Sequence, residues 1–270
     1  MDATTDRATK PATAARIYDY LLGGTHNFPA DQQAARKMIE MFPMAPGGAR
    51  SNRAFLRRAA RYVAEAGVSQ FLDIGSGIPT EGNVHEVVQD VTPGARVVYV
   101  DIDPVAVSES LDLLKGNDDA TAIRADLREP QSILDHPEVR RALDFDQPVG
   151  LLLCAVLHFV PDDDLATGLV RTFVSALPPG SHLVLSHGSV DGMPERAAQL
   201  EDAKDLYKRD TASQLFPRPR DQVARFFDGL ELVEPGVVWV PRWRPEPGDP
   251  TDFADNPTQS ASVGGVARLP

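Results

Sequence analysis

The chain has 270 residues, of which 42% are hydrophobic, and its net charge is −12 from 27 basic and 39 acidic residues. This is enough for one large α/β domain with short additions, or for two small domains. An acidic chain repels phosphate backbones, so we expect no nucleic acid partner. The single cysteine, Cys154, excludes an intrachain disulfide framework and a cysteine-rich zinc site.

No membrane partner is expected either. The first ten residues contain no apolar segment of the kind found in secretory signals. The longest apolar run, Val149–Val160, is interrupted by His158 and is too short to cross a bilayer. The sequence therefore predicts a cytoplasmic protein.

Three helices are predicted before the first strand. They span Ala14–Leu22, Ala30–Phe42 and Ala49–Ala66. The first stops at Gly23-Gly24, and a break at Pro43–Gly48 precedes the third. Since all three precede the regular alternation of strands and helices, we expect residues 1–66, a tail and these helices, to form a cap or lid.

Apolar strands alternate with helices from Val68 onward. After the first strand, further strands are predicted at Arg96–Asp101, Thr121–Ala125, Gly150–Val156, His182–Ser186, Leu230–Val240 and Ser260–Leu269, the last with a disordered tail as the alternative. Helices are predicted at Glu81–Gln89, Pro104–Lys115, Ser132–Leu143, Asp162–Leu177, Pro194–Arg209 and Arg220–Phe227. Short connections favour parallel strands. The sequence therefore predicts an α/β fold: a doubly wound, mainly parallel seven-stranded sheet over residues 67–270 with an N-terminal helical cap.

A glycine turn directly follows the first strand. Asp73 interrupts the apolar residues of this strand, and Gly75-Ser76-Gly77 comes next, followed by the predicted helix. Glycine permits positive φ and lets a ligand approach the backbone closely. Exposed N–H groups and a helix N-terminus would favour a polar or anionic ligand group there.

Two kinds of cofactor use such a turn. The dinucleotide fingerprint G-x-G-x-x-G requires a third glycine, and Thr80 stands in its place. An acidic residue two positions before the first glycine, here Asp73, is instead typical of S-adenosylmethionine (SAM) sites. A purely structural turn is the other alternative.

Acidic residues also end the next two strands, where ligands bind in doubly wound sheets. Asp101 is a candidate acceptor for ribose hydroxyls, with a helix-capping or surface carboxylate as the alternative. Asp126 could accept from an adenine amino group while Leu127 packs on the ring, with a turn residue as the alternative. The small Ala155, after the fourth strand, would let a ligand approach the backbone.

Histidines are the remaining candidates for catalysis. His158 follows the fourth strand and His187 the fifth, and for both the alternative is a core or capping histidine. The histidines show neither H-x-x-x-H nor H-E-x-x-H spacing, so no dedicated metal site is predicted. No G-x-S-x-G and no P-loop motif occurs, which argues against a hydrolase elbow and a P-loop ATPase.

Several segments together resemble one bacterial family. They are A-R-I-Y-D-Y-L-L-G-G-T-H-N-F-P-A-D at 15–31, N-R-A-F-L-R-R-A-A-R-Y at 52–62, F-L-D-I-G-S-G-I-P-T at 71–80, residues 148–161 and the terminal G-V-A-R. The chain is similar over nearly its whole length to the S-adenosyl methyltransferase family, formerly a domain of unknown function, within the Rossmann-like SAM-dependent methyltransferases. The resemblance implies a SAM cofactor and the cofactor-binding residues Asp73, Gly75, Ser76, Gly77, Asp101, Ile102, Asp126, Leu127 and Ala155.

The function predicted from these observations is in-line methyl transfer from SAM to a small-molecule acceptor. His158 is the candidate base, needed only if the acceptor must lose a proton. From the cap, Tyr18, Tyr20, Asn27 and Arg53 could reach the ligand, with Arg53 as partner of the methionine carboxylate. The alternatives are a non-catalytic SAM-binding or regulatory protein and, disfavoured by Thr80, an NAD-dependent oxidoreductase.

Overall fold

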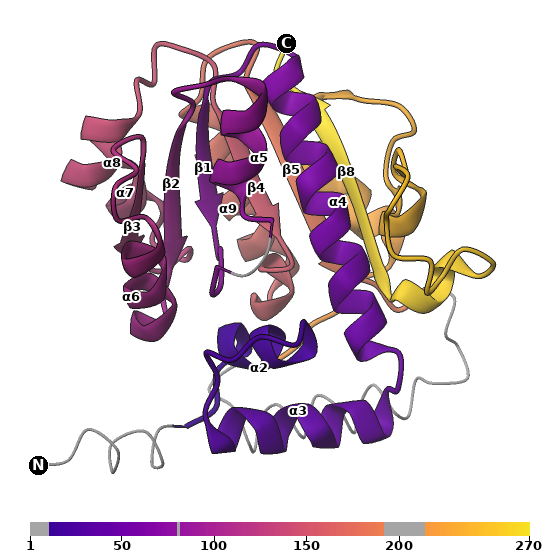
Figure 1. Ribbon diagram of the computed structural model, residues 1–270. Coiled ribbons are helices and arrows are strands. Elements are labelled where there is room, and N and C mark those ends of the chain that lie inside the picture. The colour runs from indigo at the N-terminus through magenta and orange to yellow at the C-terminus, as the bar shows by residue number, and fades with distance from the viewer. Residues whose placement is uncertain (1–10, 80–81, 192–213) are drawn as a thin grey trace, which may run out of the picture.

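A computed structural model describes residues 11–79, 82–191 and 214–270 of the protein. Its centre is a twisted sheet with the order β3-β2-β1-β4-β5-β8-β6, and β7 also pairs with β8 (Figure 1). The strands β1 to β5 run parallel, whereas β8 is antiparallel to β5, β6 and β7. The strands are β1 Gln70–Ile74, β2 Arg96–Asp101, β3 Ala120–Arg124, β4 Gly150–Cys154, β5 His182–Gly188, β6 Glu231–Leu232, β7 Val238–Trp239 and β8 Ser262–Arg268.

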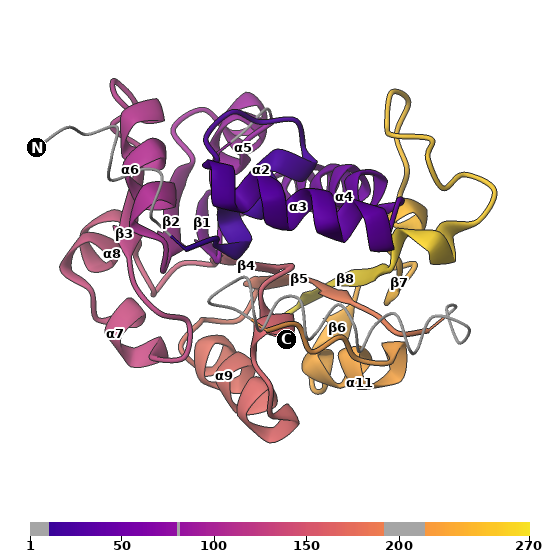
Figure 2. The same cartoon turned by 90° about the horizontal axis from the view of Figure 1, so that it is seen from below.

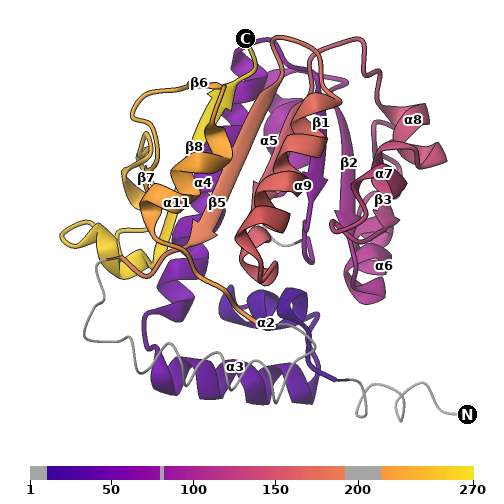
Figure 3. The same cartoon turned by 180° about the vertical axis from the view of Figure 1, so that it is seen from behind.

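Helices cover both faces of the sheet, as Figures 2 and 3 show. They are α2 Ala14–Leu21, α3 Pro29–Met41, α4 Ala45–Glu65, α5 Val84–Val91, α6 Pro104–Leu113, α7 Pro130–Leu134, α8 Pro137–Ala142, α9 Asp163–Ser175 and α11 Arg220–Ala224. One apolar core joins α4, α5 and α6 to the sheet, and a second joins α7, α8, α9 and α11 to its other face. Strands buried on both faces read as continuous apolar runs, as in Gly150–Cys154. The predicted doubly wound, mainly parallel, Rossmann-like α/β fold is confirmed.

The strand order reverses between β1 and β4, because β1 pairs with β2 on one side and with β4 on the other. In doubly wound sheets this switch opens a crevice at the carboxyl ends of the strands. The helices α2 and α3 lie across these ends, at the bottom of Figure 1. The fold thus places the glycine turn after β1 beneath the N-terminal helices.

The cap and the sheet share one long helix. α4 begins at Ala45, earlier than predicted, because Pro46 fits the first turn of a helix. Its residue Ala49 packs in a small core with α2 and α3. Further along, Phe55 and Val63 pack on the sheet. The third predicted helix thus contacts both the cap helices and the sheet.

Other boundaries also differ from the prediction. Pro137 divides the helix predicted at Ser132–Leu143 into α7 and α8. The strand predicted at Leu230–Val240 is instead two short strands, β6 and β7. The helix predicted at Pro194–Arg209 lies outside the described residues. None of the helices within the described ranges is both long and apolar enough to span a membrane.

Candidate active site

One cavity of about 780 Å³ lies between the helical cap and the carboxyl ends of the strands. This volume is in the usual range for ligand pockets, ~300–1,000 Å³. Twelve of the residues predicted from the sequence to contact a ligand line it, namely Tyr18, Arg53, Asp73, Gly75, Ser76, Gly77, Asp101, Ile102, Asp126, Leu127, Ala155 and His158. The fold therefore brings together residues that are separated by up to 140 positions in the chain. Two further candidates from the cap do not line it: Tyr20 packs on the core of the cap, and Asn27 hydrogen-bonds to Asp19, Gly24 and Gln32.

The N–H groups of the glycine turn, residues 75–77, are already hydrogen-bonded and are not free to bind a ligand. The N–H groups of Gly75 and Ser76 donate to the Val100 carbonyl at 2.8 and 3.1 Å. The N–H group of Gly77 donates to Oδ2 of Asp101 at 2.8 Å. The helix α5 begins only at Val84, so its N-terminus does not directly follow the turn. The prediction that exposed N–H groups and a helix N-terminus hold a ligand here is therefore wrong.

The two glycines have different reasons to be glycine. Gly75 has φ +72° and Gly77 has φ +68°, a region that costs other residues about 1–2 kcal/mol. A Cβ on Gly75 would come within 2.2 Å of Val156, whereas a Cβ on Gly77 would meet nothing within 4 Å. Gly75 is thus needed for packing, while Gly77 leaves open space at the cavity wall.

We expect Gly77→Ala to remain folded but to bind SAM at least tenfold more weakly, since its methyl group would project into ligand space. Gly75→Ala should lose more stability, since a clash adds to the backbone strain. Calorimetric titration with SAM and urea denaturation of both variants measure the two effects. If Gly77→Ala binds SAM as tightly as the wild type, the glycine turn is not part of the cofactor site.

Two carboxylates lie close together at the cofactor side of the cavity. Asp73 is only 4% exposed, and burial, with a contribution from Asp101, raises its pKa to about 7 although Arg53 acts in the opposite direction. Burial also raises the pKa of Asp101 to about 6. The protein thus supplies too little positive charge near the two carboxylates to keep their pKa values low. A cationic ligand in the cavity would supply it and so favour the ionised form of both groups.

Asp73 and Asp101 should make a contribution to the stability of the ligand-free protein that falls as the pH rises from about 4 to 7. An unfolded aspartate has a pKa of about 3.9, so in this interval these two groups bind more protons in the folded protein than in the unfolded chain, and raising the pH removes their contribution. Asp73→Asn should flatten this dependence. Urea denaturation of the wild type and the variant at several pH values tests it, and parallel curves would contradict the assignment of the shift to Asp73.

A guanidinium group lies near enough to this carboxylate pair to act on the pKa of Asp73. Arg53, on α4, has a buried Nε atom with no hydrogen-bond partner among the described residues, and its guanidinium lies 5.9 Å from the ring centroid of Tyr18. Ser76 likewise has a buried Oγ atom without a partner in the described ranges. Buried polar groups in folded proteins are normally hydrogen-bonded, so these two atoms mark places where a polar ligand fits.

Asp126, the third acidic residue predicted to bind the cofactor, is held by a neighbouring arginine. The carboxylate of Asp126 is paired with the side chain of Arg128 and accepts from its N–H group at 2.9 Å. Arg128 also lowers the pKa of Asp126. Asp126 thus forms the turn that was the alternative interpretation, although it lines the cavity. Ile102 nearby is 52% exposed, which leaves an apolar surface for a ring at the cavity wall.

A strained residue connects β4 to the cavity. Ala155 has φ +54°, which is uncommon outside glycine. Its N–H group is held by the carbonyl and the hydroxyl of Ser186 at 3.0 and 3.1 Å. This hydroxyl donates to Asn52, whose amide donates to the hydroxyl of Tyr18. The cap and β5 together therefore hold the backbone conformation that leads into His158.

His158 does not have the geometry of a base. Its Nδ1 atom accepts from the N–H group of Gly188 at 3.3 Å, so the proton of the neutral ring is on Nε2. Burial, with the neighbouring His187 and Arg218, keeps the pKa of His158 well below its usual value, so the ring is neutral. A neutral ring with its one lone pair already bonded has none to offer the cavity, which speaks against the predicted role as base.

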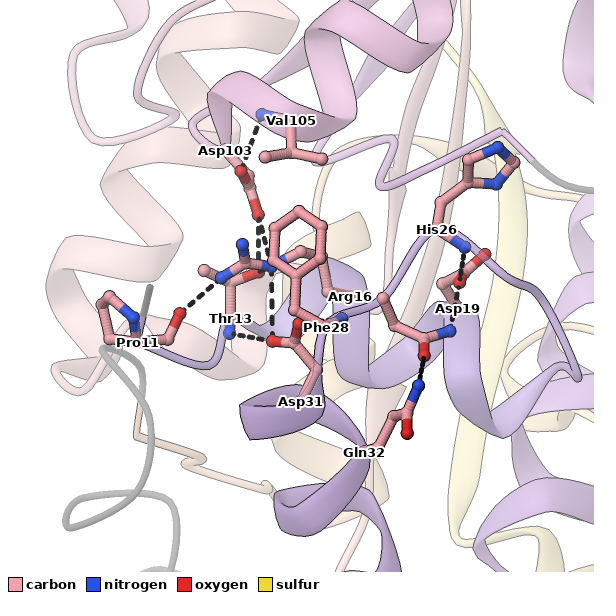
Figure 4. Close-up of polar contacts among 11 residues, drawn as sticks. Pro11, Thr13, Arg16, Asp19, His26, Phe28, Asp31, Gln32, Asp103 and Val105 are labelled. Carbon is pink, nitrogen blue, oxygen red and sulfur yellow. Dashed lines mark hydrogen bonds and ion pairs between the residues drawn. The ribbon is translucent and has the colours of Figure 1, made fainter. Parts of the chain in front are cut away.

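A buried polar cluster fixes the cap to the cofactor side of the sheet (Figure 4). The Nε atom of Arg16, on α2, lies 3.3 Å from Asp31 at the start of α3 and 3.6 Å from Asp103 at the start of α6. Thr13 donates to Asp103 at 2.5 Å. The N–H group of Asp103 in turn donates to Asp101 at 2.8 Å. The position of the cap is thereby linked to a predicted cofactor residue.

The apolar part of the cavity was not predicted from the sequence. Three of the five methionines of the chain contribute to it, together with aromatic residues: Met38, Met41, Phe42, Met44, Phe159 and Phe216. Residues 259–261 and the first residue of β8, Ser262, also belong to the wall. Met38 and Met41 are three residues apart on one face of α3, whereas Met44 directly precedes α4, and such spacing does not tell a cavity from a core.

Comparisons with known proteins agree with one another. A profile of the S-adenosyl methyltransferase family matches residues 2–270. A crystal structure of a candidate methyltransferase from Thermobifida fusca YX is 39% identical, with a TM-score of 0.89, over 99% of this chain and 98% of that chain. A DUF574 family protein from Streptomyces avermitilis MA-4680 is 41% identical, also with a TM-score of 0.89, over 97% of this chain and 99% of that chain. A search of curated proteins gave no significant match. The chain belongs to the S-adenosyl methyltransferase family, and its cofactor is SAM.

Proposed function

We propose that the protein transfers the methyl group of SAM to a small-molecule acceptor bound in the same cavity, beside the cofactor. The observation that carries this proposal is the division of the cavity into two kinds of wall. Acidic residues and the glycine turn line the side at β1 to β3, whereas methionine, phenylalanine and leucine side chains line the side at the cap. A cavity of this size, covered by the α2–α3 cap, suits a small acceptor better than a polymer.

The polar side matches the groups of SAM one by one. Arg53, with its unpartnered Nε, would hold the carboxylate, and the ionised Asp73 would face the positive charges of the ligand. Asp101 would accept from the ribose hydroxyls. Ile102 and Leu127 offer apolar surface to the adenine. The roles of these residues rest on their position in the cavity and on the chemistry of their side chains.

Methyl transfer from SAM mainly requires that the acceptor and the cofactor are correctly positioned. SAM, when bound, supplies an electrophilic methyl group on a sulfonium. The residues of this chain then have to align the acceptor with that group and exclude water. The α2–α3 cap and the apolar side chains beneath it would exclude water, because they cover the carboxyl ends of the strands. We assign no general base among the described residues.

Incubation with methyl-labelled SAM and a fractionated extract of small metabolites tests the proposal. Transfer of label to a low-molecular-weight product, lost in Asp101→Ala, is the expected result. Label that enters only protein or nucleic acid would refute a small acceptor. Tight SAM binding without transfer to any fraction would favour the alternative, a SAM-binding regulatory protein.

A further inference from the structure

Two neighbouring histidines, His158 at the cavity wall and the buried His187 behind it, are held in opposite tautomers. Arg218, only 3% exposed, directs Nη1 at Nε2 of His187 at 3.0 Å. A guanidinium can only donate, so this nitrogen of His187 is the acceptor and the ring proton is on Nδ1. That Nδ1–H group donates to the Gly188 carbonyl at 2.7 Å. His158 has the other tautomer, since its Nδ1 accepts from the Gly188 N–H group.

Arg218 is itself fixed on every side. Its Nε donates to Asp163 at 2.7 Å, and its Nη2 donates to the Val160 carbonyl at 2.8 Å. Its own N–H group also donates to the Gly188 carbonyl, at 3.0 Å. Gly188 is therefore anchored by two donors, and its N–H group has a fixed direction toward His158. A fully satisfied buried network of this kind holds one arrangement.

The consequence at the cavity is a hydrogen-bond donor with a fixed position beside aromatic side chains. The Nε2–H group of His158 has no hydrogen-bond partner in the described part of the chain, and the residue lines the cavity beside Phe159 and Phe216. The described carboxylates that line the cavity are Asp73 in β1, Asp101 at the end of β2, Asp103 just after it and Asp126 after β3, and so they belong to the cofactor side. The acceptor side thus offers a donor and apolar contacts, and no described carboxylate for an ammonium group.

We propose that the methyl acceptor is an apolar molecule carrying an oxygen that accepts a hydrogen bond, and that His158 positions it through Nε2–H. The proposal rests on the proposed function and deepens it, because it names the class of acceptor. His158 acts here as a donor to a phenolate, carbonyl or carboxylate oxygen. The surrounding methionine and phenylalanine side chains suit an aromatic body, since sulfur–ring and ring–ring contacts are favourable.

The tautomers can be measured without any ligand. Long-range ¹H–¹⁵N correlation spectra of the ¹⁵N-histidine-labelled protein distinguish the two ring nitrogens. We expect His158 as the Nε2–H form and His187 as the Nδ1–H form at neutral pH, assigned with His158→Gln and His187→Gln. A protonated Nδ1 on His158 would overturn the proposal, whether or not any variant folds.

A matched pair of probes tests the donor. In the presence of saturating S-adenosylhomocysteine, 4-nitrophenol should bind the wild type more tightly than 4-nitroaniline, which has the same skeleton but a poor acceptor in place of the oxygen. His158→Phe should lose about tenfold or more in affinity for 4-nitrophenol, the usual effect of a hydrogen bond to a charged group. His158→Gln, which retains an N–H donor, should keep most of that affinity and the preference for the phenol.

The outcomes separate this proposal from the proposed function. Equal binding of 4-nitrophenol to the wild type and to His158→Phe, or no binding to either, overturns the role of His158. A wild-type protein that fails to transfer label from SAM to any small molecule refutes the proposed function. The tautomers of the two histidines and the preference for 4-nitrophenol are measured without methyl transfer, so they test the role of His158 independently. Both variants should bind SAM with unchanged affinity, which calorimetry checks.

Discussion

Arg16→Met should lower the free energy of unfolding of the protein by about 3–5 kcal/mol, the usual effect of removing one partner from a buried ion pair. Arg16 is 2% exposed and lies between two buried carboxylates, Asp31 and Asp103. Its guanidinium also stacks 4.8 Å from the ring centroid of Phe28 (Figure 4). Methionine keeps the length of the side chain but leaves both carboxylates without their cation. SAM affinity should fall as well, since Asp103 is bonded to Asp101.

Urea denaturation and hydrogen exchange measure this effect. Exchange in α2 and α3 should increase first, because the cluster joins these helices to α6. Arg36→Met is the matched control: Arg36 is exposed on α3, and a surface change of this kind is within about 0.5 kcal/mol of neutral. A loss below 1 kcal/mol in Arg16→Met would mean that apolar packing alone holds the cap.

Asp101→Asn should weaken the binding of SAM and of S-adenosylhomocysteine together, by roughly 100-fold or more, since each hydrogen bond to a charged group contributes about 1.5–3 kcal/mol. Both ligands carry the ribose whose hydroxyls Asp101 would bind. The structure adds a second reason. The two carboxylate oxygens of Asp101 also accept from the N–H groups of Gly77 and Asp103, each at 2.8 Å. An amide nitrogen in place of one oxygen would meet an N–H group, which disturbs the turn itself.

Calorimetric titration of the variant with both ligands checks this prediction. Asp118→Asn, a change at an exposed loop position, serves as the control for the lost charge. A variant that loses one ligand and keeps the other would contradict the assignment of Asp101 to the ribose.

Most strands and helices of the sheet could be predicted from the sequence because the residue patterns that mark them are local. The strand β2 was predicted with its observed bounds, since a run of valines ends at Asp101, and Asp103 with Pro104 marks the start of α6. The failures have local causes too. Pro137 was passed over inside an amphipathic pattern, and the two short strands β6 and β7 owe their existence to pairing with β8, which no local pattern shows.

For the site, the sequence indicated residues that line the cavity, but not the contacts that they make there. Gly77 was predicted as part of a ligand turn, yet its N–H group is bonded to Asp101, a residue 24 positions away. His158 was predicted as a candidate base, with a core or capping histidine as the alternative, yet its tautomer depends on Gly188 and, through it, on Arg218. Such roles arise from contacts between distant segments. They become visible only when the fold brings these segments together.

The place of β8 in the sheet has a consequence for the order in which the protein matures during translation. β6 and β7 leave the ribosome before β8, which is the strand that both of them pair with, and β5 lacks its neighbour on that side until β8 arrives. Residues 259–261, which form part of the cavity wall, are made just before β8, and Ser262, which also lines the cavity, is its first residue. A nascent chain that has already formed β1 to β5 therefore still has an open sheet edge and an incomplete pocket. The complete cofactor pocket accordingly forms only once β8 has been made, and until then the open edge is available for pairing with another chain.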